Sequence, residues 1–150
     1  MESAQEVKEP ICWDSEDLFA IGIQIRTFAG MIYPDNEELI QLDTGYDGEL
    51  LLPYKLYRSL ALYQWEYPEE YWPVGKTVSG EIIELILAKG QVLIPRWSVA
   101  LEVFIETFEG NEELLLGRSF IRKFKVLLDG PGNQVCLIGP SVMGKEDPAS

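Results

Sequence analysis

Residues 39–53 read Leu-Ile-Gln-Leu-Asp-Thr-Gly-Tyr-Asp-Gly-Glu-Leu-Leu-Leu-Pro. One apolar run ends at Asp43, Thr44 and Gly45, and a second begins after a short acidic stretch. This order predicts a strand that delivers one carboxylate to a tight turn, which the Thr44 hydroxyl can hold by hydrogen bonding. Gly45 has no side chain, so backbone and ligand can approach each other closely there. We therefore expect Asp43 to carry the chemistry of this chain.

The rest of the chain predicts a mostly β domain, because short apolar runs alternate with turn signals. Residues 1–10 are polar and expected to be mobile, and residues 140–150 are expected to form a loose tail. Strands are expected at residues 18–28, 38–42, 49–52, 92–95, 99–108 and 114–116, and hairpins over 77–87 and 125–138. A turn is expected at 34–36 and short helices at 53–62 and 118–124, whereas the aromatic segment 63–72 fits no assignment.

Length and charge limit the function. A chain of 150 residues, 47% of them hydrophobic, is expected to form one domain with a real core. It carries 25 acidic and 12 basic residues, a formal net charge of −13. That charge argues against nucleic acid and anionic membranes as partners, because both repel a negative surface. The chain has no histidine, which excludes His-based triads and His metal sites.

Cys12 and Cys136 are too few and too far apart for a zinc motif or a disulfide framework, so we expect two reduced or buried thiols. No apolar run reaches the roughly 18 residues of a membrane span. The acidic, polar N-terminus differs from a secretion signal. These features predict a cytoplasmic protein, and nothing in them calls for a cofactor or a metal.

The spacing of Asp43, Asp47 and Gly48 also allows a calcium loop. Its third position would be Gly45, and its twelfth would be Tyr54, where a bidentate Glu belongs. We therefore reject a calcium site.

A second segment, Leu114-Leu115-Leu116-Gly117-Arg118, resembles the apolar-apolar-Gly-Arg segment that retroviral-type proteases place beside the catalytic loop. The expected hairpin at 77–83 lies between the two motifs, and a closing strand is expected at 134–138. Over about residues 18–138 the chain is thus similar to the retropepsin-like, single-lobe aspartic proteases, in particular to microbial members. We place the corresponding domain at residues 11–139.

The resemblance implies a closed, retropepsin-like barrel in a homodimer. The chain has one Asp-Thr-Gly tripeptide and the chemistry needs two carboxylates, so the active site would lie on the two-fold axis. Asp43 would be catalytic, Thr44 would hydrogen-bond across the axis, and Gly45, Gly117 and Arg118 would support the turn and the dimer. Taken alone, Arg118 could instead be a surface cation that begins a helix. The terminal strands of family members pair across subunits, which could bring Cys12 near Cys136.

The substrate-binding residues follow from the same resemblance. The family commonly has a small residue and then Ser or Thr after the Gly, where this chain has Tyr46 and Asp47. We expect Tyr46 at the edge of the substrate groove, and Asp47 to keep the proton shared by the catalytic carboxylates bound to higher pH. The hairpin tip, Val78-Ser79-Gly80-Glu81, would close over an extended peptide; otherwise it is an ordinary exposed sheet edge. Asp43, Asp47, Glu49 and Glu81 together suggest a tolerance for basic residues in substrates.

The sequence thus predicts an aspartic endopeptidase that hydrolyses peptide or protein substrates with water activated between two Asp43 carboxylates. One alternative is a catalytically silent peptide-binding module of the same fold, in which Tyr46 blocks productive binding. Another is an acidic interaction domain in which Asp43 only caps a turn.

Overall fold

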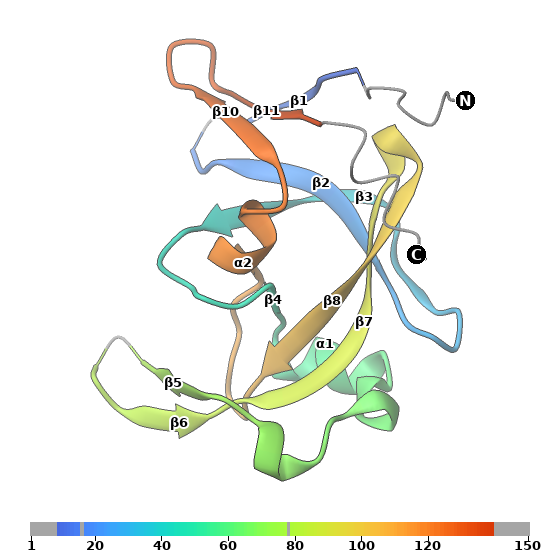
Figure 1. Ribbon diagram of the computed structural model, residues 1–150, viewed down its shortest axis with the longest axis vertical. Helices are drawn as coiled ribbons and strands as arrows, with labels where there is room; N and C mark the ends of the chain where they lie inside the picture. The colour runs from blue at the N-terminus through green and yellow to red at the C-terminus, as the bar shows by residue number, and fades with distance from the viewer. Residues whose placement is uncertain (1–8, 16, 78, 140–150) are drawn as a thin grey trace.

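A closed, six-stranded β-barrel forms the body of the protein (Figure 1). The structure is a computed structural model that describes residues 9–15, 17–77 and 79–139. The barrel order is β2-β3-β9-β4-β8-β7. Its strands are β2 (Ala20–Arg26), β3 (Ile32–Asp43), β4 (Leu50–Leu51), β7 (Ile86–Ile94), β8 (Val99–Thr107) and β9 (Leu115–Gly117). The predicted mostly β fold with a closed barrel and one or two short helices is confirmed.

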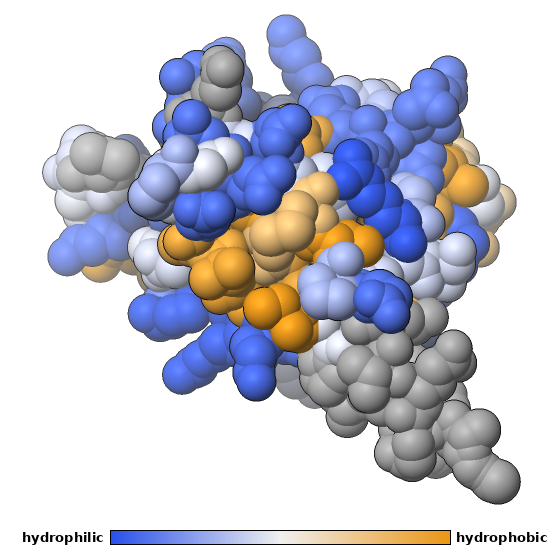
Figure 2. Space-filling model, turned by 90° about the horizontal axis from the view of Figure 1, so that it is seen from above, coloured by the Kyte–Doolittle hydropathy of each residue, from blue (hydrophilic) through white to orange (hydrophobic). Residues whose placement is uncertain are grey.

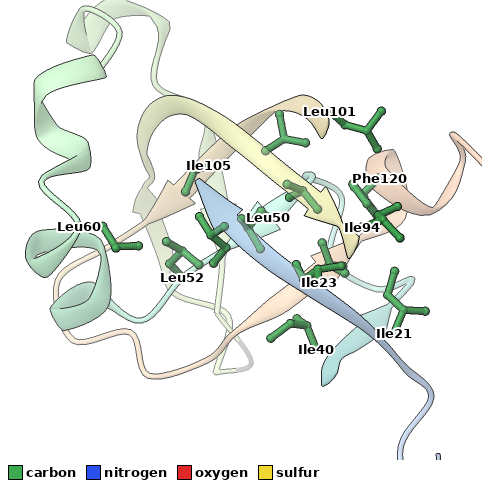
Figure 3. Close-up of a cluster of buried hydrophobic side chains, with 14 of the residues drawn as sticks. Ile21, Ile23, Ile40, Leu50, Leu52, Leu60, Ile94, Leu101, Ile105 and Phe120 are labelled. Atoms are coloured by element: carbon green, nitrogen blue, oxygen red, sulfur yellow. The ribbon is translucent and has the colours of Figure 1, made fainter. Parts of the chain in front are cut away.

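Alternating side chains fill the barrel, since successive residues of a strand face opposite sides. On β8, Leu101, Val103 and Ile105 face inward and are buried, while Glu102 and Phe104 are exposed. The interior is aliphatic and aromatic (Figure 3). Its fully buried side chains include Ile21, Ile23, Leu50, Leu52, Ile94, Ile105, Leu116 and Phe120.

Two parallel pairings give the barrel its connectivity. β3 pairs with β9 in a parallel register that aligns Asp43 with Gly117, and β4 pairs antiparallel with the other edge of β9. β4 also pairs in parallel with β8. As a result, the ends of the two motifs, about 70 residues apart in sequence, lie on neighbouring strands.

The helices are short and follow barrel strands. α1 (Tyr54–Ser59) begins after Pro53, which suits a helix start because its missing N–H has no intrahelical partner there. It buries Tyr57 and is followed by two 3₁₀ turns, Leu62–Trp65 and Glu69–Tyr71, in the segment that the sequence left unassigned. α2 (Arg118–Ile121) directly follows β9 and buries Phe120. No helix in the described part of the chain is long and apolar enough to cross a membrane.

The chain ends meet in a three-stranded sheet of order β1-β11-β10, formed by β1 (Ile11–Asp14), β10 (Lys125–Asp129) and β11 (Gln134–Ile138). Cys12 lies opposite Cys136 in the β1–β11 ladder, and the two form a disulfide. The prediction of two reduced or buried thiols is therefore wrong in that neither thiol is free. The resemblance allowed the two cysteines to be near each other across subunits, whereas here they pair within one chain. Both terminal strands pair within one chain.

A separate hairpin, β5 (Val74–Lys76) with β6 (Ile82–Glu84), projects from the barrel. The sequence predicted a hairpin at 77–87; its first strand begins earlier, and residues 86–94 belong to β7 instead.

The turn predicted at 34–36 is also wrong. Residues 34–37 lie within β3 as a bulge, because Ile23 pairs with Glu38 whereas Ile25 pairs with Tyr33. Proline is tolerated at such a bulge because no ladder hydrogen bond is lost.

Candidate active site

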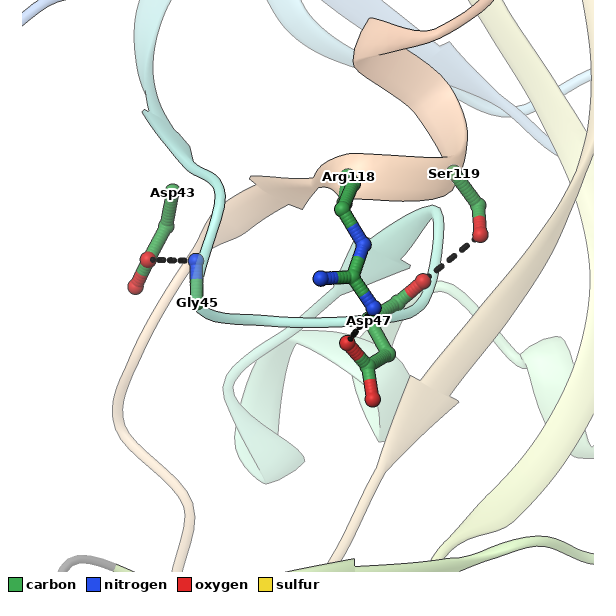
Figure 4. Close-up of polar contacts among 5 residues, drawn as sticks. All are labelled: Asp43, Gly45, Asp47, Arg118 and Ser119. Atoms are coloured by element: carbon green, nitrogen blue, oxygen red, sulfur yellow. Dashed lines mark hydrogen bonds and ion pairs between the residues drawn. The ribbon is translucent and has the colours of Figure 1, made fainter.

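Asp43 is the last residue of β3, and its carboxylate shapes the turn that follows (Figure 4). The Gly45 N–H donates to Asp43 Oδ1 at 2.8 Å, and the Tyr46 N–H donates to the Asp43 carbonyl at 3.1 Å. Asp43 is half-buried, while Thr44 and Gly45 are exposed. The turn is thus held by Asp43 itself, which leaves the Thr44 hydroxyl at the surface, and its predicted bond across a dimer axis stays a prediction.

The end of β9 and the start of α2 are hydrogen-bonded to the loop that begins at Asp43, here called the catalytic-candidate loop (residues 43–49). Three backbone bonds and one side-chain bond connect them. They run from Gly117 N to Glu49 O at 3.0 Å, Arg118 N to Tyr46 O at 2.7 Å, Ser119 N to Gly48 O at 3.2 Å, and Ser119 Oγ to Asp47 O at 2.6 Å. The loop is therefore fixed to the Gly-Arg motif along most of its length.

Gly117 is required for this close approach. A Cβ at that position would lie 2.3 Å from the Gly48 carbonyl oxygen and 2.6 Å from that of Tyr46. Both obstacles are backbone atoms, which cannot rotate away as a side chain would. The glycine of the motif is thus explained by the contact between the two segments.

Arg118 forms an ion pair with Asp47 (Figure 4). The two side chains are 50% and 79% exposed, so the pair contributes at most about 1 kcal/mol to stability. The positive charge of Arg118 offsets the negative charge of Asp47, which lies four residues after Asp43 in the sequence. The expected effect of Asp47 on a shared proton is correspondingly smaller. Arg118 braces the loop of its own chain, and a further role across a dimer remains a prediction.

The side chain of Tyr46 is half-buried between the loop, β8 and Gly117, and its predicted place at the edge of a substrate groove stays a prediction. Its hydroxyl donates to Glu106 Oε1 at 2.5 Å, and its ring and carbonyl lie against Gly117. Burial, followed by the charge of Glu106, raises the pKa of Tyr46, so the phenol stays a donor. Burial likewise raises the pKa of Glu106, although the bond from Tyr46 counteracts this.

The sequence did not identify Glu106 as a support of the site. Strand alternation puts Glu102 and Glu106 on the same outward side of β8, but Glu106 is buried and Glu102 is exposed. Only the loop that covers Glu106 makes the difference, and no local signal shows where a loop will lie.

Glu49 anchors the far end of the loop. Its Oε1 accepts from the Phe104 N–H at 2.7 Å, and its Oε2 lies 2.9 Å from Lys123 Nζ. Glu49 is buried, so it is part of the support and not of a surface that meets a substrate. Asp47 is also paired, so two of the four carboxylates on which the suggested tolerance for basic residues rested are engaged within the chain.

The tip of the β5–β6 hairpin lies on the same side of the molecule as the catalytic-candidate loop in the view of Figure 1. Ser79, Gly80 and Glu81 are exposed, and Val78 lies outside the described residues. Gly80 has a φ of +92°, which favours glycine, and the Thr77 N–H donates to the Glu81 carbonyl at 2.8 Å. The hairpin is thus internally hydrogen-bonded.

Two apolar side chains of this hairpin face solvent. Val74 is 67% exposed and Ile82 is 68% exposed. The register pairs Val74 with Glu84 and Lys76 with Ile82, so both apolar side chains lie on one face of the hairpin. In residues 9–15, 17–77 and 79–139, no cluster of three or more Asp, Glu or Cys could hold a metal ion.

No family model matches this chain. The chain is similar to a protein of Archaeoglobus fulgidus that is described only as an uncharacterized protein. The two are 27% identical over 98 residues, which cover 65% of this chain and 74% of the archaeal protein. This likeness supplies a distant relative but no activity.

Proposed function

We propose that this chain is one subunit of a homodimeric, retropepsin-like aspartic endopeptidase. The observation that carries the proposal is the parallel register of β3 and β9, which aligns Asp43 with Gly117. It joins the Asp-Thr-Gly turn and the Gly-Arg segment in one hydrogen-bonded unit. A half-buried carboxylate at the end of a barrel strand, next to an exposed turn, is suited to meet an identical carboxylate across a two-fold axis.

In the proposed mechanism the two carboxylates share one proton, because two like charges so close cannot both ionise without a large cost. Asp43 of one subunit takes a proton from water, and that water attacks the scissile carbonyl carbon. The partner subunit's Asp43 donates its proton to the carbonyl oxygen, which gives a tetrahedral diol. When the C–N bond breaks, the Asp43 that took the proton from water delivers it to the leaving amine, and the partner subunit's Asp43 takes a proton back from a diol hydroxyl as the carbonyl reforms. Tyr46 and Glu106 act as positioning residues that hold the loop from below.

The peptide would lie between the catalytic-candidate loop and the β5–β6 hairpin. Exposed backbone groups at a hairpin can bind an extended peptide as an added strand. Val74 and Ile82 would contact apolar side chains of the substrate. We therefore expect a preference for extended, apolar segments, such as those that unfolding exposes in a protein.

The silent peptide-binding alternative depended on Tyr46 obstructing the groove. The bond of its hydroxyl to Glu106 speaks against that obstruction. Because no other observation favours a silent module, it is kept only as an outcome of the experiments.

Titration calorimetry with a statine-type peptide, which imitates the transition state, tests the shared site. We expect one inhibitor bound per two chains, and no binding to Asp43→Asn. Asp35→Asn, which removes an exposed carboxylate from the bulge in β3, is the matched control and should bind normally. One inhibitor per chain, or equal binding by Asp43→Asn, would contradict the proposal.

A cytoplasmic location also remains a proposal, and the Cys12–Cys136 bond bears on it. Disulfides are rare in the cytosol outside hyperthermophiles. Trapping free thiols at the moment of lysis would decide: a largely reduced protein supports the cytosol, whereas a fully oxidised one supports an oxidising compartment.

A further inference from the structure

The two edges of the β1-β11-β10 sheet differ. The β1 edge is occupied, because Arg96 donates to the Cys12 carbonyl and Trp97 Nε1 donates to the Glu9 carbonyl at 2.7 Å. β10 forms the other edge, and its outward backbone groups have no hydrogen-bond partner within the described residues. An open edge of this kind is a template for pairing with another strand.

Apolar residues surround this open edge. Leu127 is 50% exposed, Leu128 is 52% exposed, and Ile138 on the neighbouring strand is 36% exposed. Seen from the end of the molecule that carries this sheet, an apolar patch lies within a hydrophilic surface (Figure 2). The chain has a net charge of −13, so an exposed apolar edge stands out from the rest of its surface and is suited to contact another protein surface.

The sequence of β10, Lys-Val-Leu-Leu-Asp, is complementary to itself. If two copies pair antiparallel with Leu127 at the centre, Lys125 of each lies opposite Asp129 of the partner subunit. Val126 then lies opposite the partner subunit's Leu128, so both faces of the ladder are matched. Opposite charges on directly facing residues stabilise a sheet, whereas like charges destabilise it. Lys125 forms no ion pair with any described residue of its own chain, so it is free for this contact.

We propose that the free edge of β10 is the dimer interface, and that two chains join β10 to β10 in one six-stranded sheet. This inference rests on the proposed function and names the surface that completes its site. Only residues 118–124 separate β10 from Gly117, which lies beside Asp43. In Figure 1, β10, the catalytic-candidate loop and the β5–β6 hairpin lie along one side of the molecule, and in the proposed dimer the second copy would bind on that side.

β1 stays with its own chain in this dimer, in contrast to an exchange of terminal strands between subunits. Trp13 of β1 is buried, and Arg96 joins the strand to Glu37 of β3 through an ion pair of 2.8 Å. Cys12–Cys136 is then an intrachain bond. A denaturing gel without reductant should show a single chain, and a disulfide-linked dimer would overturn this interface.

Sedimentation velocity across micromolar concentrations, with activity measured on the same samples, tests the interface. We expect the native chain to be dimeric and Lys125→Glu to weaken the dimer roughly tenfold or more, because both charge pairs become repulsive. Adding Asp129→Asn to Lys125→Glu removes the repulsion and should restore much of the dimer. Asn also keeps the side-chain oxygen that accepts from the Gly132 N–H. Lys55→Glu, with the same charge change at an exposed position of α1, is the control and should not alter dimerisation.

The outcomes separate this inference from the proposed function. If Lys125→Glu remains dimeric and cleaves substrate normally, the β10 interface is overturned and the protease stands. If Lys125→Glu dissociates and the double variant recovers, the interface is supported even if no variant cleaves any substrate. A native chain that is monomeric at all concentrations, with its fold verified by circular dichroism, overturns the interface.

Discussion

The catalytic-candidate loop and the β5–β6 hairpin lie on the same side of the molecule in the view of Figure 1, but they are held in opposite ways. The loop is connected to β8, β9 and α2 by backbone bonds, a buried Glu49 and the Tyr46–Glu106 bond. The described bonds of the hairpin run mainly within the hairpin itself, and two of its apolar side chains are open to solvent. A reaction that requires fixed distances needs a rigidly held segment such as the loop. A segment that opens and closes over a peptide needs few contacts with the rest of the molecule, as in the hairpin.

The largest effect is expected where the loop meets α2. Gly117→Ala inserts a Cβ at 2.3 Å from the Gly48 carbonyl, so the two segments must separate. We expect a loss of about 3 kcal/mol in the free energy of unfolding, together with loss of cleavage. Gly130→Ala is the control, because a Cβ there meets nothing within 4 Å. Chemical denaturation measures both, and equal stabilities would show that the loop is not held as described.

Removing the Tyr46 hydroxyl should have the next largest effect. Tyr46→Phe leaves the buried Glu106 without its donor, and we expect a loss of about 1–2 kcal/mol at neutral pH. The pKa of Glu106 in the folded chain is already raised by burial above its ordinary value of 4.5, and the bond from Tyr46 lowers it. The variant should therefore have a Glu106 pKa that is higher still.

The pH dependence follows from that direction. A carboxyl whose pKa is higher in the folded chain favours folding at low pH, and this contribution is lost as the pH rises through the folded value. The deficit of Tyr46→Phe should thus be small near pH 4 and grow towards neutral pH, and Glu106→Gln should remove the growth. Denaturation at several pH values measures it, and a deficit that shrinks with rising pH would refute this account of the pair.

A smaller effect on stability, but a clear one on binding, is expected in the hairpin. Ile82→Ala should change the free energy of unfolding by less than about 0.5 kcal/mol because its side chain is exposed. It should raise KM roughly three- to tenfold if Ile82 contacts apolar substrate groups. Ile32→Ala, at an exposed position of β3, should leave KM unchanged. A large loss of stability with unchanged KM would assign Ile82 to structure instead of binding.

The smallest effect is expected at Asp47. Its ion pair with Arg118 is exposed, so Asp47→Asn should cost less than about 1 kcal/mol in stability. Without Asp47, the positive charge of Arg118 is no longer offset, and the upper limb of the pH–rate profile should move to lower pH by less than about one unit. A movement to higher pH would contradict the position given to this pair.

The sequence predicted the barrel well because its signals are local. The apolar runs around Asp43 and before Gly117 both became barrel strands, and the closing hairpin formed where Asp129 and the following glycines indicated a turn. The turn predicted at Pro34 was wrong because proline usually marks a turn. Here the register of β2 with β3 shifts between Ile23 and Ile25, and the resulting bulge in β3 accommodates the proline.

The contacts that the sequence missed are all long-range. Glu106 becomes a support of the site only because the loop covers it, Tyr46 turns inward to meet it, and Cys12 reaches Cys136 only once both chain ends share a sheet. Each joins segments that are far apart in the sequence, so no window of neighbouring residues contains the information.

The most direct test of the central claim is cleavage of a mixture of denatured proteins from about pH 3 to 7 by the native chain, Asp43→Asn and the Asp35→Asn control. We predict cleavage by the native chain and by Asp35→Asn, with a bell-shaped pH profile, and none by Asp43→Asn. Equal cleavage by Asp43→Asn, or none by a folded, dimeric native chain, would contradict the assignment of Asp43 as a catalytic residue.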